Sequence, residues 1–329
     1  MAGERHWGRG GRARGVRAAL LTGLAIVLAG ARPALASPPP MPTYMPAEVV
    51  HSILTPSQVG TVLGELREYS INEALLQMPR FTRRGTIKLP ASNAQMLGVW
   101  ASETLLYNAE NGTSIRPVAV FNGVPKERGL DLELPATRAR MLQAVEGVLE
   151  TGIQGVQLDI EPYPTGAGFI ALLEAVDGAL ARRGLAGGLS VVAPGDTGTW
   201  SPAYTRRVGE LVGEFDPTYY DSESTEAGEY EHWVEKGLAY ETANLPAATA
   251  IVPIIPSFGP DPWHIPAVED IANASVALGE ALAQGDRVTG AGIWWWYGFY
   301  EEEGHHHHFS SAADRAAWLE RTLALGFSP

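Results

Sequence analysis

Short runs of β-branched and apolar residues alternate with longer helix-like runs along most of the chain. The short runs predict strands at residues 48–53, 71–78, 115–122, 153–161, 188–193, 215–220, 249–255 and 290–297. The longer runs predict helices at residues 56–69, 91–110, 136–151, 167–184, 201–213, 228–243, 268–284 and 311–325. A strand followed by a helix, repeated in this way, predicts a parallel sheet of the α/β class. Eight such units in a single domain predict a closed (β/α)8 TIM barrel.

Local signals agree with this fold class. Thr55-Pro56 places a capping residue before a proline at the first helical position, which predicts a helix start. An open doubly wound sheet would need a glycine-rich turn after its first strand. Residues 52–56 contain no glycine, so the barrel is favoured.

The first 36 residues predict a secretory signal peptide. Residues 1–17 are rich in arginine, residues 18–30 form a small or apolar run, and Ala34-Leu35-Ala36 provides a cleavage site. The apolar run is 13 residues long, whereas a membrane-spanning helix needs about 20. We therefore expect cleavage after Ala36 and a secreted, extracellular protein. A proline-rich leading segment (residues 37–46) and one barrel domain (residues 47–329) would follow.

Composition narrows the classes of partner. The chain has no cysteine, which excludes disulfides and thiolate catalysis, and its net charge is −13. An acidic chain is a poor ligand for nucleic acids and anionic membranes, so we expect neither as a partner. The same composition suits a soluble secreted enzyme and a neutral-sugar binder equally well. We expect a monomer with no cofactor and no metal. We expect His305–His308 to form a solvated loop, because adjacent histidines do not converge easily on one ion.

The predicted fourth strand carries an unusual polar face. Residues alternate between two faces along a strand, so Val156, Leu158 and Ile160 would pack against the surrounding helices. The opposite face would point into the barrel and consists of Gly155, Gln157, Asp159 and Glu161. Its polarity rises toward the carboxyl end of the strand, where the active sites of such barrels lie.

Asp159 and Glu161 stand two residues apart on this face, roughly 6–7 Å along the backbone. Two carboxylates at that separation repel when both are ionised, so one of them tends to keep its proton near neutral pH. A glycosidase needs such a protonated acid to donate to the departing sugar oxygen. Anchoring of loops, or pairing with an arginine, is the structural alternative for the two acids.

The segment Gln154-x-x-Gln157-x-Asp159-x-Glu161 resembles the Asp-x-x-Asp-x-Asp-x-Glu motif of glycoside hydrolase family 18, which includes chitinases and endo-β-N-acetylglucosaminidases. The last two acids match, and amides replace the first two. The resemblance implies that Glu161 is the general acid and that Asp159 holds the N-acetyl group of the substrate. The oxygen of that group would attack the anomeric carbon, so that no protein nucleophile is needed.

Other segments resemble the same family. Thr218-Tyr219-Tyr220-Asp221 is similar to its Met-x-Tyr-Asp motif, with threonine in place of methionine. This implies that Tyr220 binds the reacting acetamido group and that Asp221 lines the sugar site. The segment 290–295 is similar to the family's eighth strand, which implies that Trp295 points inward beneath the sugar while Trp294 and Trp296 are structural.

Two further residues complete the predicted substrate-binding set. Tyr163, after the fourth strand, is a candidate platform for stacking a sugar. Gln157 can hydrogen-bond Asp159, but an amide cannot take up a proton at ordinary pH as the family's aspartate does.

The sequence thus predicts a secreted glycosidase that cleaves β-linked N-acetylglucosamine-containing glycans with retention of configuration. Two alternatives stay open. One is a chitinase-like protein that binds glycans without cleaving them. The other is a glycosidase with two protein carboxylates, in which Asp221 or Glu223 is the partner of Glu161 and the sugar lacks an N-acetyl group.

Overall fold

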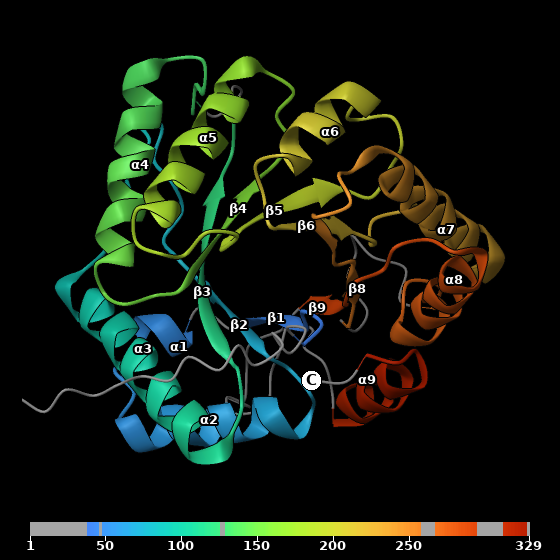
Figure 1. The fold of residues 1–329 in the computed structure, drawn as a ribbon, viewed down its shortest axis with the longest axis horizontal. Coiled ribbons are helices and arrows are strands. Elements are labelled where there is room, and N and C mark those ends of the chain that lie inside the picture. Colours follow the sequence, from blue (N-terminus) through green and yellow to red (C-terminus); the bar gives the residue numbers. More distant parts are fainter. Residues whose placement is uncertain (1–37, 46–47, 126–128, 258–266, 295–311, 328–329) are drawn as a thin grey trace, which may run out of the picture. The chain divides into compact units, whose positions relative to one another are not determined.

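The computed structural model describes residues 38–45, 48–125, 129–257, 267–294 and 312–327. In these ranges all the strands belong to one parallel sheet (Figure 1). The strands are β1 (Pro42–Met45), β2 (Glu73–Gln77), β3 (Arg116–Gly123), β4 (Gly155–Ile160), β5 (Leu189–Pro194), β6 (Glu214–Thr218), β7 (Ala250–Ile251), β8 (Ile254–Pro256) and β9 (Gly292–Trp294). The pairs β5–β6 and β1–β9 close the sheet into a ring.

The nine strands occupy eight positions around the ring, here called staves, because β7 and β8 lie in line at one position and both pair with β6. Every pairing is parallel, and each stave pairs with the next stave along the chain until β9 returns to β1. The predicted single-domain (β/α)8 barrel is therefore confirmed.

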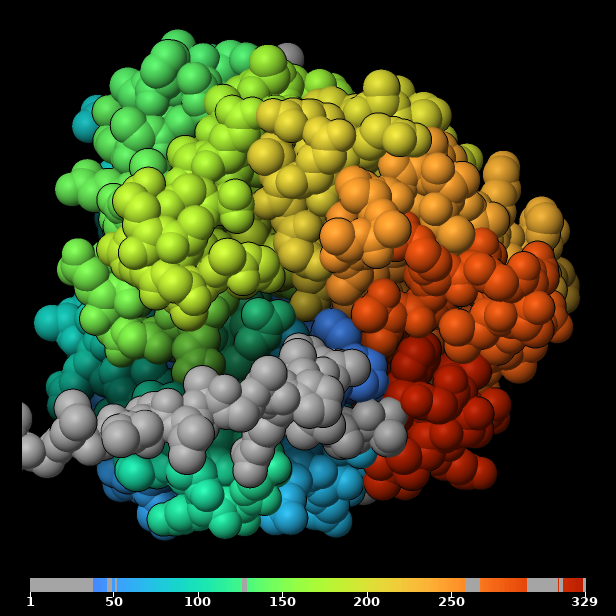
Figure 2. Space-filling view, viewed as in Figure 1, coloured from blue at the N-terminus to red at the C-terminus, as the bar shows by residue number. Residues whose placement is uncertain are grey.

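Helices surround the barrel in chain order (Figure 1), and α4 packs against α5, α7 against α8, and α8 against α9 (Figure 2). They are α1 (Glu48–His51), α2 (Pro56–Glu68), α3 (Ala91–Asn111), α4 (Pro135–Leu149), α5 (Ala167–Ala181), α6 (Pro202–Gly209), α7 (Ala227–Asn244), α8 (Ile271–Gln284) and α9 (Ala312–Ala324). Helix α2 begins as predicted, with a capping box between Thr55 and Gln58 and Pro56 in the first turn. No helix in the described ranges has both the length and the apolarity needed to cross a bilayer.

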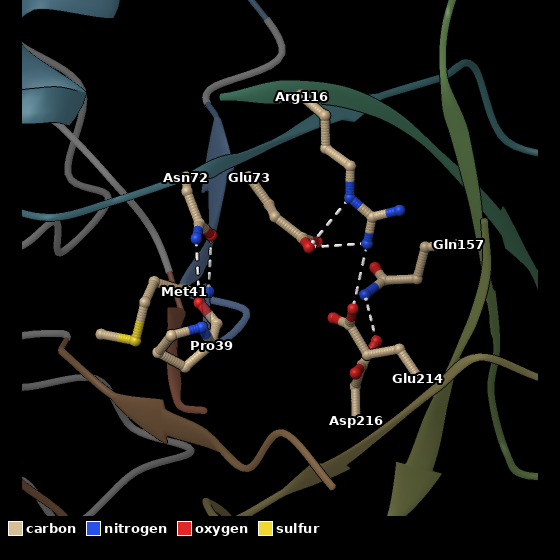
Figure 3. A network of polar contacts seen from close by, with 8 residues as sticks. All are labelled: Pro39, Met41, Asn72, Glu73, Arg116, Gln157, Glu214 and Asp216. Carbon is tan, nitrogen blue, oxygen red and sulfur yellow. Dashed lines mark hydrogen bonds and ion pairs between the residues drawn. The ribbon is translucent and has the colours of Figure 1, made fainter. Parts of the chain in front are cut away.

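The predicted first strand is wrong. Residues 48–51 form the short helix α1, and β1 lies earlier, at residues 42–45, inside the predicted proline-rich leading segment. Proline is tolerated as the first residue of a strand, and the residues after Pro42 are buried between β2 and β9. The Asn72 side chain fixes the approach to this strand, since it donates to the Pro39 carbonyl oxygen and accepts from the Met41 amide, both at 2.8 Å (Figure 3).

The apolar core has two parts. The larger part lies between the barrel and the helices and contains Val156, Leu158 and Ile160, as predicted for the outer face of β4. The smaller part fills the barrel with Tyr44, Leu75, Val118, Val120, Val192 and Ile254, and Tyr163, Tyr220 and Trp294 pack against it. The inner face of β4 carries Gln157 and Asp159, which are both buried inside the barrel.

Candidate active site

A cavity of about 290 Å³ opens at the carboxyl ends of the adjacent strands β4, β5 and β6. Its walls are Glu161, Tyr163, Pro194, Gly195, Asp196, Thr218, Tyr220, Asp221, Ser222 and Trp233. The parallel registers explain this grouping, because they place Leu158 beside Val191 and Pro194 beside Thr218, so that the three strands end together. Ligand sites of such barrels lie at this face.

Four of the sequence-predicted residues meet in the cavity: Glu161, Tyr163, Tyr220 and Asp221. Asp159 is buried one pair of residues deeper on β4, with 7% of its surface exposed. Gln157 is fully buried deeper still and does not line the cavity. Trp295 lies outside the described residues, so its predicted place in the sugar site stays a prediction.

Asp159 on β4 and Glu161 directly after this strand both have a raised pKa. Burial, followed by the neighbouring charge of Glu161, raises the pKa of Asp159 to about 8, against an opposing effect of Arg80. The Glu161 side chain lines the cavity, but the surrounding residues shield its carboxyl group from part of the solvent. This desolvation raises the pKa of Glu161. Asp221 raises that pKa further, whereas hydrogen bonding from Tyr163 and the charge of Arg80 lower it. The site can therefore hold a proton near neutral pH beside an accessible acid.

Tyr163 is fixed on the wall of the cavity by two contacts. Its hydroxyl oxygen lies 2.7 Å from the Thr218 hydroxyl oxygen at the end of β6. Its ring meets Trp200 edge-on, with the ring centroids 6.1 Å apart. Trp200 is itself held by a hydrogen bond of 2.9 Å from its indole nitrogen to the Pro164 carbonyl oxygen.

A buried carboxylate holds the loop after β6 in place through three hydrogen bonds, which are referred to below as the clamp. Glu269, 1% exposed, accepts hydrogen bonds from the backbone amides of Asp221 and Ser222 and from the Ser222 hydroxyl, at 3.0, 2.6 and 2.7 Å. Asp221 adopts a positive φ of 62°, a conformation that non-glycine residues rarely take without such support. The clamp therefore holds the exposed Asp221 side chain at the cavity.

The predicted faces of the eighth stave are wrong for the residues that the structure describes. Ile293 belongs to the outer core, and Trp294 points into the barrel. The Trp294 ring lies 4.6 Å from that of Tyr44 and 5.4 Å from that of Tyr220, centroid to centroid. Among the described residues, the tryptophan that contacts a predicted catalytic residue is thus Trp294. Three consecutive tryptophans leave the register of the strand ambiguous in the sequence.

Below the acid pair, the barrel holds a second polar layer (Figure 3). Arg116 contacts Glu73 at 2.6 Å and Glu214 at 3.1 Å. The Gln157 amide donates to an Asp216 carboxylate oxygen at 2.8 Å, so it is turned toward Asp216, whereas the sequence suggested Asp159. Burial raises the pKa of Asp216 to about 7 and that of Glu214 well above its usual range.

Sequence reasoning missed several residues of the cavity. Asp196, after β5, accepts hydrogen bonds from the Gly198 and Thr199 amides and from the Thr199 hydroxyl at 2.6–2.7 Å, and these outweigh burial and lower its pKa. Trp233 reaches the cavity from α7, edge-on to Tyr219 at 5.4 Å. The position of Asp196 directly after a predicted strand was a usable signal, whereas nothing in the helix sequence distinguishes Trp233 from a core residue.

The part of the chain that the structure describes offers no group of three or more His, Cys, Asp or Glu side chains that could hold a metal ion. The His305–His308 run lies outside the described residues. The residues that line the cavity offer carboxyl groups, phenols and hydroxyls.

Solved structures share this architecture. The catalytic domain of a family 18 chitinase from the fern Peteris ryukyuensis superposes with a TM-score of 0.56 and 10% identity, over 88% of this chain and 100% of that one. A family 18 chitinase of Flavobacterium johnsoniae gives 0.56 and 12%, over 88% and 95%. An endo-1,4-β-mannanase of Rhizomucor miehei gives 0.57 and 9%, over 89% and 96%.

At these identities the likeness concerns the fold. The chain has the barrel fold that glycoside hydrolase family 18 proteins also have. Neither a protein-family model nor a curated protein matches the sequence.

Proposed function

We propose that the protein is a glycoside hydrolase in which Glu161 is the general acid. The observation that carries this proposal is the placement of Glu161 in an open cavity at the carboxyl ends of the strands, with its pKa raised and a second acid, Asp159, buried behind it. A raised pKa keeps the carboxyl group protonated closer to neutral pH, which is what protonation of a departing sugar oxygen requires. The barrel fold shared with family 18 chitinases supports the same class of reaction.

We further propose that the substrate is a β-linked glycan that contains N-acetylglucosamine. Tyr220 lines the cavity beside Glu161, and its hydroxyl is electrostatically coupled to Asp159 and Glu161. In this proposal Asp159 and Tyr220 bind the acetamido group and hold its oxygen against the anomeric carbon. The acetamido oxygen bonds to the anomeric carbon as Glu161 protonates the leaving oxygen and the glycosidic bond breaks. Water, which gives a proton to Glu161, then displaces the acetamido oxygen, and these two inversions together retain the configuration.

A second candidate mechanism has its own supporting observation. Asp221 lines the same cavity as Glu161, and its charge is one of the causes of the raised pKa of Glu161. Asp221 could therefore serve as the second carboxylate of a glycosidase that needs no acetamido group on its substrate. Hydrolysis of glycans that lack this group, together with resistance to thiazoline mimics of the oxazolinium intermediate, would favour this second mechanism.

Comparison of wild-type protein with Glu161→Gln on a panel of glycans tests the first proposal. The substitution removes the transferable proton while it keeps the size of the side chain, so we expect the turnover number to fall by about 10²–10⁴ with an unchanged melting temperature. Glu68→Gln, at an exposed position of α2, is the matched control and should keep full activity. Equal turnover by wild type and Glu161→Gln would contradict the assignment. Glycan binding without any hydrolysis would instead indicate a chitinase-like binding protein.

We also propose that the protein is exported and acts as a monomer. The signal-like residues 1–36 support export. The amino-terminal sequence of the protein recovered outside the producing cell tests this, and Ser37 is the expected first residue.

A further inference from the structure

Glu269 is a buried acid that the proposed mechanism does not use. It stands two residues before α8, is 1% exposed, and does not line the cavity of Glu161. Its carboxylate nevertheless holds two consecutive residues of the cavity wall, Asp221 and Ser222, through the clamp. Burial of a carboxylate is costly unless hydrogen bonds satisfy it, so this placement of Glu269 calls for an explanation.

The clamp uses both oxygens of the carboxylate. Oε2 accepts from the Asp221 amide, and Oε1 accepts from the amide and the hydroxyl group of Ser222. The Ser222 hydroxyl oxygen in turn accepts from the Ser224 amide at 3.1 Å. A glutamine offers one oxygen and one NH2 group, so in either orientation its NH2 group would face a backbone amide. The hydrogen bonds therefore require a carboxylate at position 269.

The turn that the clamp holds is one that its residues disfavour. Asp221 and Glu223 have φ angles of 62° and 57°, in the left-handed region that residues other than glycine rarely adopt. Such conformations persist where the surrounding structure determines them. The turn brings Asp221 and Ser222 into the wall of the cavity that Glu161 also lines.

We propose that Glu269 is a positioning residue of the Glu161 cavity: it holds residues 221–224 in the turn that keeps the Asp221 carboxyl group in the cavity wall. Glu269 belongs to the connection between β8 and α8, and the turn belongs to the connection between β6 and α7. The clamp therefore also joins two loops at the mouth of the barrel. The catalytic consequence of this inference rests on the function proposed above.

The position of Asp221 has a consequence for the proton on Glu161. Burial raises the pKa of Glu161, and the charge of Asp221 raises it further. The charged and titratable groups that face Glu161 are Asp159 on β4, Arg80 after β2, Asp221 after β6, and the phenols of Tyr44, Tyr163 and Tyr220. Release of the turn would withdraw Asp221 from this set, so the pKa of Glu161 would fall.

Titration of the Glu161 side-chain carboxyl carbon by NMR tests the inference without any need for turnover, and loss of the signal in Glu161→Gln assigns it. We expect the midpoint to move to lower pH in Glu269→Gln, in the same direction as in Asp221→Asn. The double variant should move it no further than Asp221→Asn does, because both substitutions act through one carboxyl group. Asp270→Asn is the control: it removes the adjacent charge, its asparagine still caps α8, and the midpoint should stay at the wild-type pH.

The pH profile of hydrolysis supplies the catalytic readout. Activity is lost on the alkaline side as Glu161 deprotonates, so Glu269→Gln should shift that limb to lower pH, whereas a purely structural role would lower the melting temperature without moving the limb. Where Glu269→Gln does not fold, Ser222→Ala decides by the same criterion with a smaller shift, since it removes one of the three hydrogen bonds.

Two results of the titration would overturn the inference. One is an unmoved midpoint in folded Glu269→Gln. The other is a shift that adds to that of Asp221→Asn in the double variant, because it would show that Glu269 acts on Glu161 by its own charge. Full activity of Glu161→Gln would overturn the proposed function instead, and the titration would still decide whether Glu269 positions Asp221.

Discussion

Trp233 is the residue of the cavity whose contribution can be separated most easily from the chemistry. Its indole reaches the cavity from α7 and is held edge-on by Tyr219. A sugar that covers roughly 55 Å² of apolar surface there would gain about 1.4 kcal/mol. We expect Trp233→Ala to weaken glycan binding about tenfold in calorimetry. Leu105→Ala, exposed on α3, should bind as wild type does, and equal affinity in both variants would remove Trp233 from the sugar site.

At the level of single residues, the sequence predicted the positions that strand alternation determines. Asp159 and Glu161 follow from the periodicity of one strand, whereas Tyr220 and Asp221 were expected only from the resemblance of residues 218–221 to a family motif. The partner of Gln157 could not be predicted, because Asp216 lies on β6 and comes within 2.8 Å only when the barrel closes. The Trp294 side chain was assigned to the wrong face, since a run of aromatic residues carries no alternation that would fix the register.

The strands β2, β3 and β6 meet in an ion-pair cluster whose removal should destabilise the barrel. Arg116 is 28% exposed at its side chain, and Glu73 and Glu214 are nearly buried. Arg116→Met would leave these carboxyl groups without a cation, and we expect a loss of about 2–3 kcal/mol in the free energy of unfolding near neutral pH. The loss should shrink as the pH falls, because Glu214, whose pKa is raised by burial, takes up a proton and no longer needs a cation beside it.

The matched control for this cluster is an exposed ion pair on the outer surface. Arg182 pairs with Glu146 at 3.1 Å, and its side chain is 62% exposed. Arg182→Met should cost less than about 1 kcal/mol in urea denaturation, because solvent screens such a pair. Equal losses for the two variants would show that the buried cluster does not stabilise the barrel.

At the scale of elements, the sequence predicted a strand for seven of the eight staves, but it did not predict β1. Four residues that start with proline carry too weak a pattern to compete with the valines of residues 48–51. Pairing with β2 and β9, which come from distant parts of the sequence, makes β1 a strand. Such non-local pairing is the part of a barrel that local propensity cannot reveal.

For the whole molecule, the buried acids predict an unusual dependence of stability on pH. Burial raises the pKa of Asp159 to about 8 and that of Asp216 to about 7, from the usual 3.8. Between about pH 4 and about pH 7–8, the folded protein holds protons on these two acids that the unfolded chain has already released. Stability is therefore fully present below about pH 4 and is lost as the pH rises through about 7–8.

Chemical denaturation at pH 5 and pH 8 measures this dependence. We expect the free energy of unfolding to be lower at pH 8. Asp216→Asn mimics the protonated acid and can still accept from Gln157, so it should flatten the profile, whereas Asp177→Asn on α5 should not. A free energy of unfolding that rises from pH 5 to pH 8 would show that the interior acids are ionised in the folded protein.

The central claim is that Glu161 donates a proton to the leaving group of a glycan. The most direct measurement compares wild type with Glu161→Gln on two N-acetylglucosaminides, one with a sugar and one with a dinitrophenyl leaving group. A dinitrophenolate departs without protonation, whereas a sugar alkoxide does not. We predict a large loss of turnover on the sugar-linked substrate and little loss of the glycosylation step on the dinitrophenyl one. Equal losses on both substrates, or no loss on either, would contradict the assignment of Glu161 as the general acid.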